Sequence, residues 1–176
     1  MERINIPPSE FVAGPFELWD HQWALLASGD FASRRFNCMT VSWGSLGVIW
    51  NQPFAMVLVR PQRYTYKFIE QFDTFTLCVF PESHRGTLEN LGTRSGREID
   101  KIGASGLTPI AAVRVASPIF DEAELAIECR KMYFDDLEHR HFLADFIMPM
   151  YRGDYHRMYF GQVVHIAGNA RYRRQG

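Results

Sequence analysis

Short stretches of alternating or wholly apolar residues recur along most of the chain, and this pattern is typical of β-strands. The clearest is Arg35 to Trp43, in which successive side chains fall on two opposite faces. The stretch from Ala123 to Phe134 also resembles a helix, but the aromatic residues near its end favour a strand. In order, the pattern predicts strands at 23–27, 35–43, 55–59, 75–80, 110–115, 118–121, 123–134 and 158–166.

Apolar residues at helical spacing are rarer. They predict a helix at 65–72, a second at 83–91 that begins with a serine cap, and a third at 141–148. The stretch 92–107 fits neither pattern, and a loop of that length in a small domain is usually functional. Because strands and helices do not alternate regularly, we expect one mainly β domain over residues 1–176. Its predicted architecture is a split antiparallel β-barrel of the Greek-key type with a few flanking helices.

Composition narrows the class of protein. Of the 176 residues, 47% are hydrophobic and 22% are charged, and the net charge is -1, as in an ordinary globular domain. This lack of a basic surplus argues against a nucleic-acid partner. No apolar run approaches the roughly 20 residues that would span a membrane, and the first residues do not resemble a signal peptide. The three cysteines are widely spaced, so we expect reduced thiols in a cytoplasmic protein.

Several common catalytic and ligand-binding motifs are missing. The sequence has no G-x-G-x-x-G and no G-x-x-x-x-G-K-[ST], the motifs of Rossmann and P-loop nucleotide binding. It also has no C-x-x-C, no H-E-x-x-H and no G-x-S-x-G. The mixed charge run at 135–141 is best read as a solvated face, so no metal site is expected. No acid–base or nucleophilic side chain can be assigned.

Two stretches carry a resemblance to a known family. The first is Asn37 to Gly44 (N-C-M-T-V-S-W-G), followed by Arg60 to Tyr66 (R-P-Q-R-Y-T-Y). The second is Ser95 to Ile102 (S-G-R-E-I-D-K-I), which leads into Gly106 to Pro109. In order and spacing they resemble the flavin-reductase-like family of FMN-binding split barrels, including its flavoredoxin-like members. The resemblance implies bound FMN, and it contributes to the expectation of a homodimer.

The first stretch offers suitable chemistry for the flavin ring. FMN has a flat tricyclic ring, which needs an apolar or aromatic face together with hydrogen-bonding groups at its edge. The strand face that carries Asn37, Met39, Val41 and Trp43 supplies both, and backbone groups of the same strand can address the ring edge. An amphipathic barrel strand without any ligand would show the same alternation, so the residues alone leave both readings open.

The phosphate of FMN would need cations and N–H donors. Arg60, Arg63 and Thr65 stand where a strand ends and a helix opens, a favourable place for an anion. Surface ion pairs and a simple helix cap are the alternatives. The resemblance implies that Lys101 and its loop lie over the flavin. The alternative is that Lys101 is an ordinary solvated lysine of a loop. The expected FMN-binding residues are Asn37, Met39, Thr40, Val41, Ser42, Trp43, Arg60, Arg63, Tyr64, Thr65, Ser95, Gly96 and Lys101.

Three functions are compatible with these sequence features. The first is an oxidoreductase in which reduced nicotinamide, bound transiently, passes hydride to FMN, and electrons then reach free flavin or another acceptor. The second is an FMN electron carrier without small-molecule turnover. The third is a barrel that has lost its flavin, which the retained motifs argue against. The choice between NADH and NADPH and the final acceptor stay open.

The apolar segment 142–150 supports a homodimer, because a small barrel would struggle to bury it.

Overall fold

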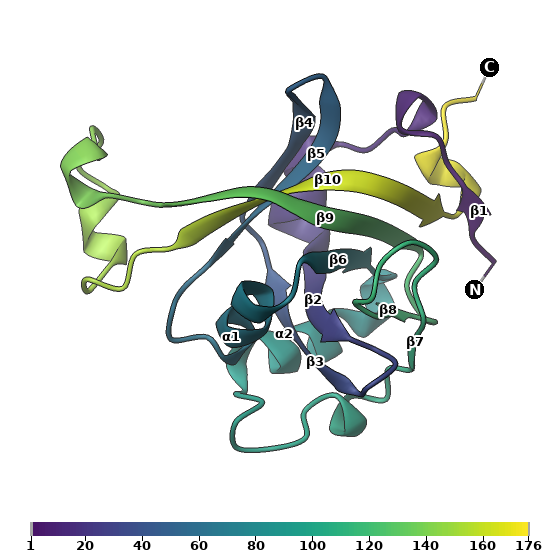
Figure 1. Ribbon diagram of the computed structural model, residues 1–176, viewed down its shortest axis with the longest axis horizontal. Coiled ribbons are helices and arrows are strands. Elements are labelled where there is room, and N and C mark those ends of the chain that lie inside the picture. Colours follow the sequence, from purple (N-terminus) through teal and green to yellow (C-terminus); the bar gives the residue numbers. More distant parts are fainter. Residues whose placement is uncertain (1, 176) are drawn as a thin grey trace.

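A computed structural model describes residues 2–175 of the chain. Its framework is an antiparallel sheet of eight strands in the order β3-β2-β6-β9-β10-β5-β4, with β1 added beside β10 (Figure 1). This arrangement confirms the prediction of a mainly β fold. The strands are β1 (Ile4–Asn5), β2 (Ala24–Asp30), β3 (Arg35–Val41), β4 (Gly44–Ile49), β5 (Gln52–Val59), β6 (Thr74–Val79), β9 (Leu125–Asp136) and β10 (Arg157–Gly168). A separate hairpin pairs β7 (Pro109–Ile110) with β8 (Ile119–Phe120).

The long hairpin of β9 and β10 forms the middle of the sheet. Its register shifts at two places, and such bulges increase the local twist and help a sheet to curl. One shift lies at Gly161, where a Cβ atom would stand 2.5 Å from the Phe75 ring and 2.7 Å from Cys129 Cβ. Only a glycine therefore permits this close approach. Phe75 and Tyr159 are fully buried nearby in the barrel core.

Two helices cover the part of the sheet formed by β2 and β3. They are α1 (Tyr64–Gln71), which follows β5, and α2 (Arg85–Thr93), which follows β6 (Figure 1). Strand β3 is consequently buried on both faces: Met39 and Val41 join the barrel core, whereas Cys38 joins a second core beneath α2. The predicted alternation of β3 is thus confirmed, and the residues on both faces of its central part are buried.

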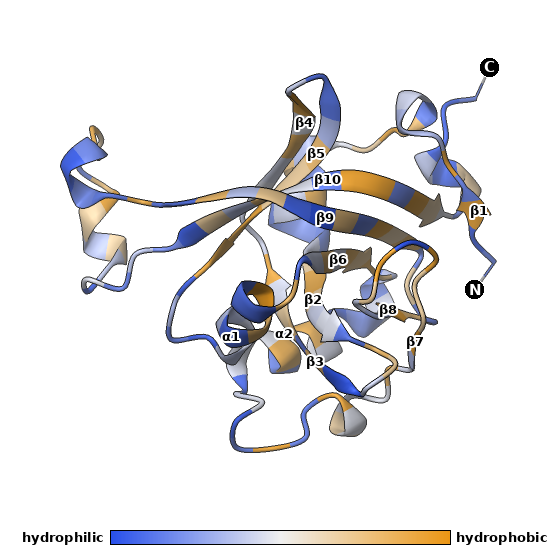
Figure 2. Cartoon of the chain, in the orientation of Figure 1, coloured by the Kyte–Doolittle hydropathy of each residue, from blue (hydrophilic) through white to orange (hydrophobic). Residues whose placement is uncertain are grey.

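The ends of β9 and β10 extend away from the body and carry residues 137–156, which we call the arm (Figure 1). The predicted helix at 141–148 is wrong, because the arm contains only single 3-10 turns at His139–His141 and Met148–Met150. Two of its apolar side chains lie largely in solvent: Leu143 is 97% exposed and Phe146 is 74% exposed. Apolar and polar residues follow one another along the arm (Figure 2).

Other local predictions need correction. The sequence did not reveal β4, since glycines weaken its strand pattern. The strand predicted at 110–115 is reduced to the two residues of β7. Helix α2 begins at Arg85 without a side-chain cap from Ser83, and Gly92 lies inside it. Within residues 2–175, no helix is long and apolar enough to cross a membrane.

Candidate functional site

A cleft of about 220 Å³ opens where the N-terminus of α1, strand β3 and the loop after α2 meet. We call it the helix–loop cleft. A second hollow of about 460 Å³ adjoins it and shares Tyr64, Gly96 and Lys101 with it. Both therefore lie within one continuous trough beside the loop, comparable in size to ligand sites in other proteins. The helix–loop cleft is lined by the predicted residues Met39, Arg63, Tyr64, Thr65, Ser95, Gly96 and Lys101, and Asn37 lines the adjoining hollow.

Asn37 ties the three walls of the cleft together. Its buried amide Nδ2 donates to Thr65 Oγ1 at 2.8 Å and to the carbonyl oxygen of Cys38 at 3.3 Å, which fixes the first turn of α1 on β3. The loop passes just above it. A Cβ atom on Gly96 would stand 2.6 Å from Asn37 Oδ1 and 3.1 Å from Tyr64 Cδ1, so glycine is needed here. The two motifs distant in sequence thus meet at one place.

Two basic side chains are bound to the C-terminal end of α2. The Arg63 guanidinium donates to the carbonyl oxygen of Gly92. Lys101 Nζ donates to the carbonyl oxygens of Leu91 at 2.8 Å and Arg94 at 3.2 Å. Helix C-terminal carbonyls attract cations, because the helix dipole places partial negative charge there. Lys101, which is only 6% exposed, therefore fastens the loop to the helix.

Neither of these two cations forms an ion pair with a carboxylate within residues 2–175. Burial lowers the pKa of Arg63, and the neighbouring Arg60 lowers it further. Burial also lowers the pKa of Lys101, with Arg63 contributing in the same direction. The positive charges are held close together by neutral carbonyl groups, so the cleft keeps a net positive potential that favours an anion.

The N-terminus of α1 adds neutral donors to this positive potential. The backbone N–H groups of Tyr64 and Thr65 lie in the first helical turn, where no helix carbonyl can accept from them. The Ser95 hydroxyl lines the same cleft and accepts from Arg97 N at 3.3 Å. A guanidinium, free N–H groups and hydroxyls are the usual donor set for a phosphate. With the close approach at Gly96 and the apolar Met39, the residues fit a ligand with a phosphate and a flat ring.

Arg60 and Trp43 do not line this cleft, and both contact the arm instead. Arg60 forms a salt bridge with Asp154 at 2.7 Å and donates to the Met150 carbonyl oxygen at 3.0 Å. The Trp43 ring lies 5.0 Å from the ring of His156. We call this second group, together with Tyr151, the arm junction. These two predicted residues therefore lie apart from the helix–loop cleft.

His156 contacts two aromatic side chains of the arm junction, Trp43 and Tyr151. Its Nδ1 lies 2.9 Å from the Tyr151 hydroxyl, and its ring packs beside Trp43. Burial, reinforced by the positive charge of Arg60, lowers the pKa of His156 to about 4. The imidazole is therefore neutral near pH 7.

Three further predicted residues belong to β3 and its end. The Thr40 hydroxyl donates to the Leu88 carbonyl oxygen at 2.5 Å, and Val41 is buried in the barrel core. Ser42 follows β3 directly. Their side chains are absent from the walls of the helix–loop cleft. Because β3 is the last strand of the sheet order among residues 2–175, alternate backbone groups on its outer side have no neighbouring strand.

Comparison with known proteins shows the family of the chain. The pattern described as "Flavin reductase like domain" matches residues 21–174. The chain belongs to the flavin reductase-like family. Among solved structures, the flavin reductase-like chain resembles the flavoredoxin of Desulfovibrio vulgaris (Miyazaki F), with 22% identity over 91% of this chain and 73% of that one and a TM-score of 0.67. Comparison with curated proteins gives no match.

Two other solved structures resemble this flavin reductase-like chain. One is an FMN-binding protein from Thermus thermophilus with bound p-hydroxybenzaldehyde, with 21% identity over 90% of this chain and 80% of that one and a TM-score of 0.67. The other is an FMN-binding domain of a flavin reductases-like enzyme from Shewanella baltica OS155, with 14% identity over 96% and 78% and a TM-score of 0.69. These likenesses confirm the split-barrel fold of the family.

Sequence reasoning missed two residues, one in the helix–loop cleft and one in the arm junction. Arg97 lies in the second motif, and its guanidinium donates to the Gln62 carbonyl oxygen at 3.0 Å and lies 5.4 Å from the centre of the Tyr64 ring. Its position directly after Gly96 in the second motif could have indicated that it belongs to the site. Asp154 gave no signal, because its partner Arg60 is distant in sequence. Within residues 2–175, no group of three or more His, Cys, Asp or Glu is placed to hold a metal ion.

Proposed function

We propose that this protein binds one FMN per chain in the helix–loop cleft and works as a flavin-dependent oxidoreductase. The observation that carries the proposal is the convergence of Arg63, Thr65 and free helix N–H groups on one cleft, in a chain of the flavin reductase-like family. Relatives that are named as FMN-binding proteins and as flavoredoxin support the same cofactor.

In this proposal each wall of the cleft holds a different part of FMN. Arg63, the N–H groups of Tyr64 and Thr65, and the Ser95 hydroxyl bind the phosphate. Met39 and the amide of Asn37 lie toward the ring, and the backbone of Thr40, Val41 and Ser42 reaches its edge.

The remaining residues of the proposed site act on these walls. Lys101 holds the loop in position through the α2 carbonyls, and Gly96 lets that loop approach. When bound, FMN supplies hydride and electron transfer between reduced nicotinamide and an acceptor such as free flavin. Hydride transfer of this kind requires no acid–base side chain of the protein.

An electron carrier without small-molecule turnover is the second candidate. Flavoredoxins of Desulfovibrio vulgaris and Methanosarcina acetivorans are among the structures that this chain resembles. A carrier would use every FMN contact described above. Turnover of reduced nicotinamide is therefore the property that separates the two functions.

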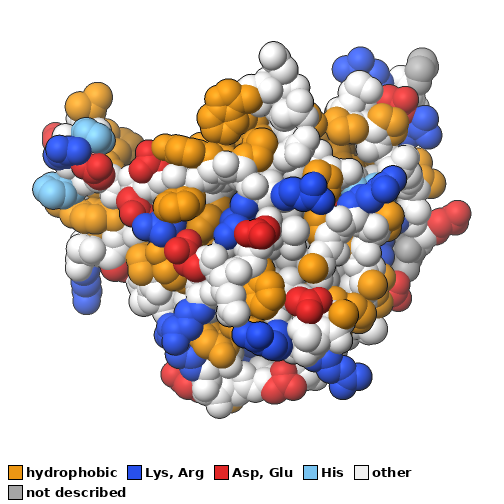
Figure 3. Space-filling view, in the orientation of Figure 1, with side chains coloured by type: hydrophobic (Ala, Val, Ile, Leu, Met, Phe, Trp, Pro, Cys, Tyr) orange, Lys and Arg blue, Asp and Glu red, His pale blue; other side chains and the backbone are white. Residues whose placement is uncertain are grey.

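We also propose a homodimer that uses the arm. Exposed Leu143, Phe146 and Met148 form an apolar surface of a kind that monomers rarely leave uncovered. Hydrophobic side chains also surface over the β4–β5 hairpin and along β9 toward the arm (Figure 3). Light scattering tests this proposal: Phe146→Asp should shift the mass from two chains to one, and a wild-type monomer at micromolar concentration would contradict it.

The buried, unpaired cysteines support a cytoplasmic location.

Titration with FMN tests the cofactor directly. Quenching of flavin fluorescence should saturate at one FMN per chain, and a protein that leaves the fluorescence unchanged would refute the proposal. Bound FMN is then mixed with NADH or NADPH without oxygen, and loss of the flavin colour reports reduction. Continued nicotinamide oxidation with added free flavin identifies a reductase. Reduction that stops after one equivalent, even with free flavin present, identifies a carrier.

A further inference from the structure

A separate pocket of about 330 Å³ opens between the N-terminal residues 8–15 and the β4–β5 hairpin, beside β9 and β10 (Figure 1). We call it the barrel-end pocket. Within residues 2–175, it shares no lining residue with the helix–loop cleft or with the adjoining hollow. We propose that the barrel-end pocket binds a small uncharged apolar molecule, with the dimensions of a single substituted benzene ring. Such a ligand is additional to FMN and does not depend on the proposed flavin function.

The floor of the barrel-end pocket belongs to the barrel core. Ile127 of β9 and Val163 and Ile166 of β10 line it, and all three side chains are buried. Leu46 and Phe54 of the β4–β5 hairpin form one of its walls. Protein interiors are close-packed, and voids larger than a water molecule are few. A pocket that reaches the core from outside is therefore no ordinary surface hollow, and its size and position match ligand sites in the mouths of β-barrels.

The walls of the barrel-end pocket select an apolar ligand. Every lining residue is a proline, phenylalanine, alanine, leucine, glycine, valine or isoleucine, so the side chains provide neither a hydrogen-bond partner nor a charge. A polar or charged group would lose its water there without compensation. A peptide segment is disfavoured for the same reason, since its backbone N–H and C=O groups need partners. An engineered apolar cavity of about 150 Å³ binds benzene. The larger volume of about 330 Å³ therefore leaves room for a ring with a substituent.

The N-terminal wall of the pocket is fixed before any ligand binds. Ile6 N donates to the Ile166 carbonyl oxygen at 2.9 Å, and Val12 N donates to the Tyr172 carbonyl oxygen at 2.9 Å. The Phe11 ring stacks on the Tyr172 ring, with centroids 6.4 Å apart at an interplanar angle of 16°. Three prolines also line the pocket: Pro8, Pro15 and Pro53. Because proline fixes φ, these walls cannot readily collapse, and a preformed pocket lowers the entropic cost of binding.

The competing occupant is an apolar side chain from the arm of a second copy of the chain. Leu143 and Phe146 are exposed at the arm and could in principle enter an apolar pocket. Charge argues against this pairing. Asp145 directly precedes Phe146 and is exposed, so insertion of Phe146 would bring a carboxylate to a pocket whose lining residues carry no cation. A free uncharged molecule carries no such penalty.

Nuclear magnetic resonance of methyl groups, with toluene as the probe, tests the barrel-end pocket. Toluene is titrated into the FMN-saturated protein, and the methyl signals of Ile127, Val163 and Ile166 should shift and saturate at one toluene per chain. The methyl signals of Leu107 and Ile119, in the second core beneath α2, are the internal control and should stay in place. Benzoate, which adds a charge to the same ring, should shift none of these signals. No shift with toluene, shifts of equal size in both cores, or an equal response to benzoate overturns the inference.

Substitutions in the pocket sharpen this test. Ala13→Phe places a ring in the pocket and should weaken toluene binding at least about tenfold, because the ligand loses buried apolar contacts. Ala116→Phe, at an exposed position between β7 and β8, is the matched control and should keep the wild-type affinity. Val163→Thr keeps the shape of the floor but adds a hydroxyl group, and it should weaken binding about threefold or more. It decides the matter if Ala13→Phe does not fold. Wild-type affinity in both pocket variants overturns the inference.

Phe146→Asp distinguishes the two occupants. If the arm of a second copy fills the pocket, this variant binds toluene more tightly than the wild type does, and the inference fails. Equal affinity in the two proteins shows that the pocket is open to a small molecule. Toluene binding can be measured equally well in the flavin-free protein, so a failure of this inference and a failure of the proposed FMN site are distinguishable.

Discussion

Arg63 and Arg60 lie three residues apart in one motif, yet they belong to two different regions of the molecule. In the helix–loop cleft, Arg63 is held by a neutral carbonyl group of α2. In the arm junction, Arg60 is held by the carboxylate of Asp154 at 2.7 Å. A carbonyl orients a guanidinium and leaves its charge in place, whereas a carboxylate neutralises it. The first region is therefore prepared for an anionic ligand, and the second joins the arm to the barrel.

Removing Arg63 should lower FMN affinity more than any other substitution. Arg63→Ala is expected to lower FMN affinity about 10- to 100-fold, because hydrogen bonds to charged groups contribute about 1.5–3 kcal/mol each. Arg60→Ala is the control and should change FMN affinity by less than about threefold, since that charge is already paired. Fluorescence titration of both variants measures the difference. A larger loss in Arg60→Ala would reverse the assignment of the two regions.

Lys101→Met should weaken both folding and binding. The substitution leaves the carbonyl oxygens of Leu91 and Arg94 without a buried partner, and we expect the free energy of unfolding to fall by about 1–3 kcal/mol. FMN affinity should fall as well, because the loop loses its attachment to α2. Lys67→Met, at an exposed position on α1, is the matched control. If Lys101 faced the flavin ring instead, its loss would shift the reduction potential of bound FMN without lowering the thermal stability.

Acidification should loosen the arm junction and leave the helix–loop cleft in place. The folded protein holds the pKa of His156 at about 4, below its ordinary value of 6.5. Between these values the unfolded or undocked histidine takes up a proton more readily than the docked one. The stabilising contribution is therefore complete above pH 6.5 and is lost as the pH falls toward 4. Nuclear magnetic resonance titration of the His156 imidazole measures this, and a midpoint near pH 6.5 would contradict the described packing.

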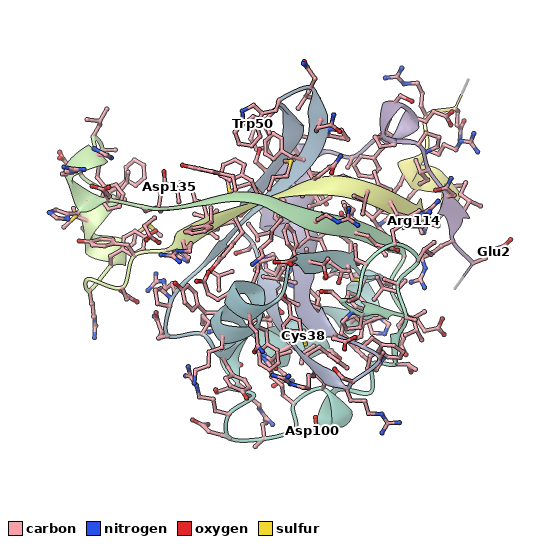
Figure 4. The ribbon with its side chains drawn as sticks, in the orientation of Figure 1. Glu2, Cys38, Trp50, Asp100, Arg114 and Asp135 are labelled. Carbon is pink, nitrogen blue, oxygen red and sulfur yellow. The ribbon has the colours of Figure 1, made fainter. Side chains whose placement is uncertain are left out.

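Trp43→Ala should have the smallest effect on FMN. Its ring contacts His156 at the arm junction, so any loss of FMN affinity should stay within about fivefold, the value of one aromatic contact of about 1 kcal/mol. Trp50→Ala is a suitable control because Trp50 lies exposed at the β4–β5 turn (Figure 4). Trp19 is unsuitable, since it is buried and a Cβ on Gly44 would stand 2.4 Å from its ring. A loss as large as that of Arg63→Ala would move Trp43 into the flavin site.

The sequence predicted the helix–loop cleft better than the arm junction, and the reason is physical. Asn37, Thr65 and Gly96 stand in motifs whose alternation, helix start and glycine each follow from local backbone rules. Local backbone rules do not predict the partner of Arg60. That partner, Asp154, comes from a segment whose position depends on how β9 and β10 extend. Likewise, the sequence shows that Lys101 is a cation in a loop, but only the packing of that loop on α2 shows which carbonyls it binds.

Hydrogen exchange of backbone amides is the most direct test of FMN binding in the helix–loop cleft, because it locates FMN without any substitution. Saturating FMN should slow exchange in peptides that cover residues 62–66 and 93–101, which form the walls of the helix–loop cleft. We expect the strongest protection at the first turn of α1, where Tyr64 and Thr65 N–H groups would donate to the phosphate. Unchanged exchange in both segments, with flavin fully bound, would show that FMN does not bind in the helix–loop cleft.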